Sequence, residues 1–64
     1  MTEYEEALED LQRHLVSMNV PREYRQKVMA SLAVADREVV PGMCKELIAA
    51  LEWMNEMGRI DKLQ

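Results

Sequence analysis

Apolar residues along the first part of the chain recur at alternating steps of four and three positions. The residues in this series are Tyr4, Leu8, Leu11, Leu15 and Met18. In a helix this spacing places the side chains in one narrow stripe, and the other positions here are nearly all polar. Thr2 and Glu5 have the spacing of a capping box, in which each side chain accepts a hydrogen bond from the other residue's backbone N–H. We therefore predict a helix over residues 3–19.

Proline residues divide the rest of the chain into two further helical patterns. Pro21 lacks a backbone N–H and restricts the residue before it, so we expect it to end the first helix and to begin a second over residues 21–36. Two adjacent valines precede Pro41, and β-branched residues in that position favour extended backbone. We therefore predict a connection over residues 37–42 before the third helix.

The third helical pattern covers residues 43–57, and Gly58 follows it as the left-handed residue that commonly ends a helix. Its apolar positions cover about half of the helix circumference, which is wider than contact with one neighbour requires. They are Met43, Leu47, Ile48, Ala50, Leu51, Met54 and Met57. Trp53 lies on the shoulder of this face, either as an anchor for an interface or as a rim residue that closes the core. We expect this helix to bury one side in its own chain and the other in a second copy.

These patterns predict an all-α fold with a single helical domain over residues 1–64, in which residues 59–64 form a frayed tail. The three short helices would form a compact bundle or a helical hairpin with a third arm. Chains of 64 residues are usually reinforced by disulfides, a metal or oligomerisation. Cys44 is the only cysteine and His14 the only histidine, which argues against a disulfide within the chain and against a structural zinc site. We therefore expect a homodimer without a metal or another cofactor.

The residue types that carry most enzyme chemistry are scarce. Nucleophilic catalysis by Cys44 would need His14 as its base, whereas a lone cysteine beside an apolar helix face is ordinarily a buried hydrophobe. The two glycines, Gly42 and Gly58, do not form a phosphate-binding loop, so we expect no catalytic site. The chain shows neither a secretion signal nor a run of about 20 apolar residues, which predicts a cytoplasmic protein without a membrane partner.

Charge is distributed unevenly, although the formal net charge is −4. The first twelve residues carry −5, residues 13–37 carry +3 and the remainder carries −2. Arg22, Arg25 and Lys27 point in separate directions around the second helix, so they do not make the continuous basic stripe typical of nucleic-acid binding. The sequence therefore argues against nucleic acid as the partner, and a nucleic-acid-binding dimer is the alternative.

Two surfaces remain for a protein partner. The first surface, on the third helix, consists of Leu47, Ile48, Leu51, Trp53, Met54 and Met57. The second surface, at the acidic start of the first helix, consists of Glu3, Glu5, Glu6, Glu9 and Asp10. We interpret the chain as a small regulatory adaptor that acts through protein–protein contacts. The acidic surface leaves open the alternative that the protein is an acidic inhibitor of a nucleic-acid-binding host enzyme.

The chain as a whole resembles a known group of proteins, from its opening TEYEEALEDLQRHL to its closing LIAALEWMNEMGRIDKLQ. In size and helical character it resembles the small early-region accessory proteins of lambdoid bacteriophages. The resemblance implies a helical, dimeric protein that is made in the bacterial host cytoplasm early in infection. It also implies an action on phage development or host functions through protein contacts, and it carries no functional residue across to this chain.

Overall fold

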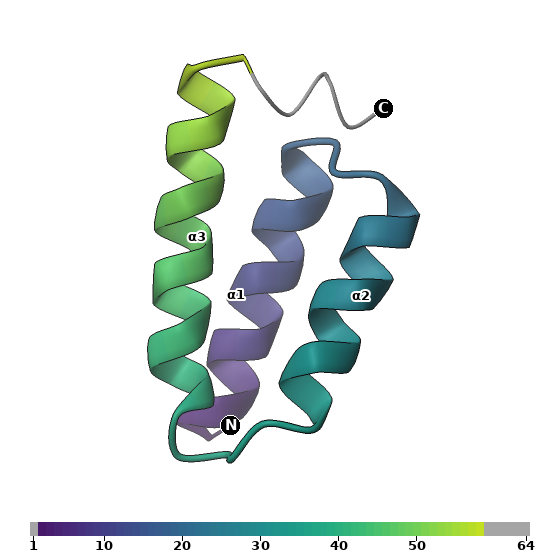
Figure 1. The fold of residues 1–64 in the computed structure, drawn as a ribbon. Coiled ribbons are helices and arrows are strands. Elements are labelled where there is room, and N and C mark those ends of the chain that lie inside the picture. Colours follow the sequence, from purple (N-terminus) through teal and green to yellow (C-terminus); the bar gives the residue numbers. More distant parts are fainter. Residues whose placement is uncertain (1, 59–64) are drawn as a thin grey trace.

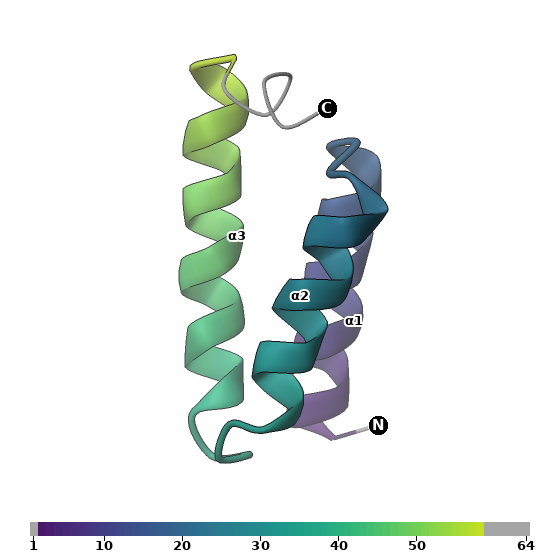
Figure 2. The ribbon, with the colours of Figure 1, turned by 45° about the vertical axis from the view of Figure 1, so that its right-hand side comes forward.

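The computed structural model describes residues 2–58, which form three helices and no strand (Figure 1). The helices are α1 (Glu3–Ser17), α2 (Arg22–Ala33) and α3 (Val40–Glu56). The predicted all-α fold of three short helices is confirmed. α1 and α2 run antiparallel, and α3 then runs parallel to α1 (Figures 1 and 2). α1 packs most closely against α3, while α2 approaches both of the other helices less closely.

Local hydrogen bonds explain where α1 begins and ends. The Thr2 hydroxyl accepts a bond from the Glu5 N–H at 3.2 Å and the Glu5 carboxylate accepts one from the Thr2 N–H at 3.4 Å, which completes the predicted capping box. At the other end Asn19 adopts a left-handed conformation with φ of 58°. The N–H groups of Asn19 and Val20 donate to carbonyls of the last turn at 3.1 and 3.0 Å, the pattern of a Schellman motif. α1 therefore ends at Ser17, two residues before the predicted end.

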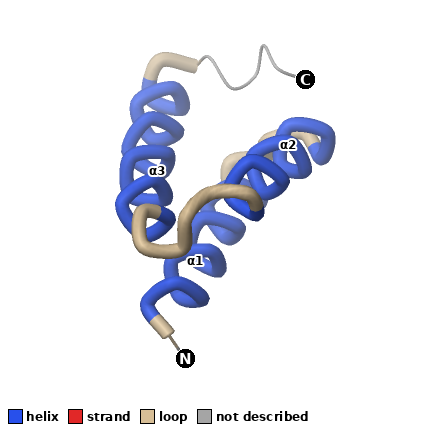
Figure 3. Tube along the Cα trace, turned by 60° about the horizontal axis from the view of Figure 1, so that its bottom comes forward, coloured by secondary structure: helices blue, strands red, loops and turns tan. Residues whose placement is uncertain are grey.

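The start of α3 differs from the prediction. The helix begins at Val40, three residues earlier than expected, and Pro41 lies in its first turn. A proline there loses no hydrogen bond, and its fixed φ suits a helix. Val40 is completely buried, so the core holds this residue and overrides the preference of paired β-branched residues for extended backbone. The connection therefore lies between Ala33 and Val40 and crosses one end of the molecule (Figure 3).

The core is small and draws on all three helices. Its buried residues are Leu11, Leu15, Val20, Leu32, Val40 and Cys44. Val20 follows the left-handed Asn19 and packs into this core, as the residue after a Schellman turn commonly does. Six buried side chains leave little stability in reserve for a chain of this length.

Three further expectations from the sequence concern the end of α3, the tail that follows it and membrane-spanning segments. Gly58 has φ of +71°, so it is the left-handed residue that was predicted to follow the last helix. The tail predicted for residues 59–64 lies outside the described residues. None of the helices in residues 2–58 is long and apolar enough to cross a membrane.

Candidate interaction surfaces

Cys44 lies in the core, with 1 % of its surface exposed. Burial raises the pKa of its thiol, and the negative charge of Asp10 raises it further. The thiolate is the nucleophilic form, so both effects oppose reactivity. The predicted role of Cys44 as a small buried hydrophobe agrees with this position.

His14 joins the two parallel helices. Its ring Nδ1 lies 2.8 Å from the backbone oxygen of Asp10, and its Nε2 lies 3.8 Å from a carboxylate oxygen of Glu52 on α3. The first distance is a hydrogen bond within α1, and the second brings the imidazole beside α3. Within residues 2–58 no group of three or more His, Cys, Asp or Glu side chains is arranged to hold a metal ion.

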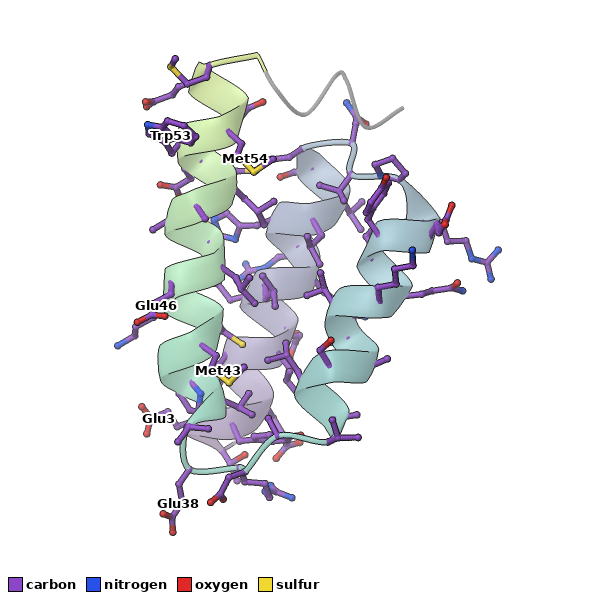
Figure 4. All side chains as sticks on the ribbon, viewed as in Figure 1. Glu3, Glu38, Met43, Glu46, Trp53 and Met54 are labelled. Carbon is purple, nitrogen blue, oxygen red and sulfur yellow. The ribbon has the colours of Figure 1, made fainter. Side chains whose placement is uncertain are left out.

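The first predicted surface is divided between two sides of α3. Its inward part consists of Leu47, Ile48, Leu51 and Met54, which are partly buried against the core. Its outward part consists of Trp53 and Met57, which are 53 % and 58 % exposed. Trp53 follows the buried Cys44 by nine residues, or two and a half helical turns, and therefore lies on the opposite side of the helix. Figure 4 shows Trp53 and Glu46 on the outer side of α3 and Met54 on the side facing the other helices.

We call this outward side of α3 the outer α3 face, defined by Ala49, Ala50, Trp53 and Met57. The two alanines are small and exposed, so another helix can approach the backbone closely beside the tryptophan. Three charged residues of α3, Lys45, Glu46 and Glu56, are exposed on or beside this face, and Lys45 also lines a hollow next to the start of α1. The outer α3 face therefore combines a large aromatic side chain with a shallow surface and charged residues at its ends.

A second feature lies between α1 and α2, and we call it the arginine groove. Nine residues line it: Glu9, Gln12, Arg13, Val16, Ser17, Arg22, Arg25, Gln26 and Met29. The lining residues of α2 are spaced at i, i+3, i+4 and i+7, and four of those on α1 repeat that spacing, so two helical stripes face each other. The groove has a volume of about 740 Å³.

The groove corrects one inference from the sequence. Arg22 and Arg25 line the same depression, and Arg13 joins them from α1. Lys27 does point elsewhere, with its ammonium 3.4 Å from the Glu23 carboxylate and 5.6 Å from the centre of the Tyr24 ring. The helix-by-helix projection missed this cluster because it forms between two helices. The shared i, i+3 and i+4 spacing on α1 and α2 was the signal that could have revealed it.

The second predicted surface, at the acidic start of α1, is exposed over most of its residues. Glu3, Glu6, Glu9 and Asp10 line a hollow of about 480 Å³ that also includes Pro41, Lys45 and Ile48 of α3. Glu5 lies outside that hollow, where its carboxylate belongs to the capping box. Part of the acidic surface therefore lies directly beside α3.

The aromatic ring of Tyr4 contacts the connection between α2 and α3. The Arg37 guanidinium lies 4.2 Å from the centre of the Tyr4 ring, a cation–π contact that holds the connection before α3 against the start of α1. The predicted stripe residue Tyr4 thus has a second role besides packing.

Comparison of this chain with protein-family models, with curated proteins and with solved structures finds no match. The resemblance to lambdoid phage accessory proteins therefore stays a prediction from the sequence.

Proposed function

We propose that this protein is a small regulatory adaptor that works as a homodimer and acts by binding another protein. The observation that carries the proposal is the outer α3 face, where Trp53 and Met57 are more than half exposed opposite the core. Tryptophan is the residue type most enriched among the residues that dominate interface energies. A second copy covering this face would also add buried apolar surface to a chain whose described residues form a core of six buried side chains.

The shape of the outer α3 face supports an antiparallel arrangement of the two α3 helices. When two such helices pack antiparallel about a point near Ala50, Lys45 and Glu46 of each copy both lie near Glu56 of the other, so one attraction is offset by one repulsion. A parallel arrangement would instead place like charges together, which is unfavourable. Trp53 of each copy would then cover the small alanines of its neighbour. We propose this twofold packing, in which the same surface is used by both copies.

The location and pathway in the proposal come from the sequence resemblance. It places the adaptor in the cytoplasm of a bacterial host, where it would modulate phage development or host functions. The arginine groove remains outside the proposed dimer contact, so each copy keeps that surface for a further protein.

Sedimentation velocity at micromolar concentration tests the dimer. The wild-type chain should sediment as a dimer, and Trp53→Ala should shift it to a monomer because the central anchor is removed. Val34→Ala is the matched control, because Val34 is an exposed apolar residue away from α3 and its removal should leave the dimer intact. A wild-type monomer, or a Trp53→Ala dimer of unchanged affinity, would refute the proposal.

A charge exchange tests the orientation. Lys45→Glu should weaken the dimer by a few-fold, because it places like charges opposite one another, whereas Glu56→Lys exchanges its contacts with Lys45 and Glu46 and should change the affinity little. Combining the two substitutions in one chain should restore the affinity. If the double variant is weaker than both single variants, the two α3 helices are not antiparallel in this register.

A further inference from the structure

The arginine groove carries positive charge in a chain that is acidic overall. Its four ionisable lining residues have a formal charge of +2, whereas the whole chain has −4. The groove lies wholly between α1 and α2, with no lining residue from α3. The outer α3 face and the arginine groove are therefore separate surfaces.

The hydrogen-bonding state of the arginines points to an acidic ligand. The Nε atom of Arg25 is buried and has no hydrogen-bond partner among the described residues. A carboxylate is the acceptor that best fits a guanidinium, and because Nε itself is shielded, a ligand would reach Arg25 through the rest of its guanidinium. Arg13 does pair with Asp10 at 2.7 Å, but 76 % of its side chain is exposed, and such surface pairs are weak enough to exchange partners.

The apolar part of the groove points to a ligand with aliphatic side chains. Val16 is 56 % exposed and Met29 is partly buried, and both lie among the groove-lining residues. Two neighbouring helices offer a depression into which the side chains of a third helix fit. An amphipathic helix typically anchors in such a groove through residues spaced at i, i+3, i+4 and i+7.

We propose that the arginine groove binds an acidic amphipathic helix of a partner protein. Aliphatic side chains of that helix pack on Val16 and Met29, and its carboxylates bond to Arg13, Arg22 and Arg25. The inference names the partner chemistry of the proposed adaptor and rests on that function only in taking the ligand to be a protein. Nucleic acid fits less well, because Glu9 lines the groove and the acidic start of α1 continues beyond it, where a phosphate backbone would be repelled.

Fluorescence anisotropy with synthetic helical peptides tests the proposal on the full-length chain. The probe is a labelled peptide with leucine at i, i+3, i+4 and i+7 and glutamate at most other positions. Two control peptides replace every glutamate by lysine or every leucine by alanine. The acidic leucine peptide should bind saturably in the micromolar range, more weakly as salt is added, and the two controls should bind at least about tenfold more weakly.

Substitutions in the chain locate the site. Arg22→Gln with Arg25→Gln should weaken peptide binding about tenfold, because two charge-assisted contacts are lost. Lys27→Gln is the control matched to Arg22→Gln alone, since each removes one positive charge from α2, and because Lys27 lies outside the groove its loss should change affinity less than about twofold. Arg22 is exposed, so Arg22→Gln alone should fold and still weaken binding if the double variant does not fold.

Three results would overturn the inference. One is equal binding of the acidic and basic peptides, and another is an equal loss of affinity in Lys27→Gln and Arg22→Gln. The third is a single-stranded or duplex oligonucleotide that binds more tightly than the acidic peptide and competes with it. Failure of the proposed dimer can be told apart from failure of this inference. A wild-type monomer that still binds the acidic peptide would refute the dimer contact at the outer α3 face and would still support the proposed ligand of the arginine groove.

Discussion

The start of α3 gives a sharp test, because two adjacent valines differ in burial. Val39 is 52 % exposed and precedes the helix, whereas Val40 is completely buried in its first turn. Substituting each by alanine removes the same two carbon atoms. At about 0.8 kcal/mol for each buried carbon, Val40→Ala loses about 1.6 kcal/mol of transfer free energy. The cavity that remains raises the expected loss to about 2–3 kcal/mol.

Val39→Ala should lower the free energy of unfolding by less than about 0.5 kcal/mol, because its side chain is already half in water. A chain of this size has about 3–5 kcal/mol in total, so Val40→Ala should remove about half of it. Urea unfolding followed by circular dichroism, at one protein concentration for all variants, measures both changes. Equal losses at the two positions, or a larger loss at Val39, would show that Val40 does not enter the core as the first residue of α3.

Three further predictions concern the caps and the thiol. Thr2→Ala should lower the free energy of unfolding by about 1 kcal/mol in the same urea assay, because the Glu5 N–H loses its acceptor, while an unchanged midpoint would contradict the capping box. Gly58→Ala should cost about 1 kcal/mol, because φ of +71° strains any residue with a Cβ, and a gain in stability would exclude that conformation. Burial, and then the charge of Asp10, raise the pKa of Cys44 above its ordinary value of 9.0, so its contribution to stability is complete below that pH and is lost as pH rises through the higher native value. As pH rises above about 9, the wild-type chain should therefore lose stability more steeply than Cys44→Ala, and parallel pH curves would contradict the assignment.

Sequence reasoning succeeded where the determining chemistry is local. Thr2 and Glu5 cap α1 because their spacing places each side chain on the other's backbone, and no distant residue is needed. Gly58 follows the end of α3 for an equally local reason, because glycine tolerates a positive φ without strain. The stripe of leucines in α1 also predicted its buried side, since Leu11 and Leu15 are in the core.

Sequence reasoning failed where tertiary packing decides. The valines before Pro41 favour extended backbone by themselves, but burial of Val40 selects a helix instead. The arginine groove forms between α1 and α2, so projecting each helix separately missed it, although the spacing shared by the two helices was a signal for it. The wide apolar face of α3 was recognised, but the sequence did not show that Trp53 lies opposite the core rather than on its rim.

The parallel arrangement of α1 and α3 has an electrostatic consequence at one end of the molecule. Helix dipoles that point the same way place two partial positive charges side by side, and the first turn of α3 has neither an acidic residue nor a side-chain cap. Glu3 and Glu6 of α1 line the hollow that includes Pro41 in that turn, and Figure 4 shows Glu3 near it. The acidic start of α1 therefore neutralises two helix ends at once, so the carboxylates that look available for partners already stabilise the fold that displays them.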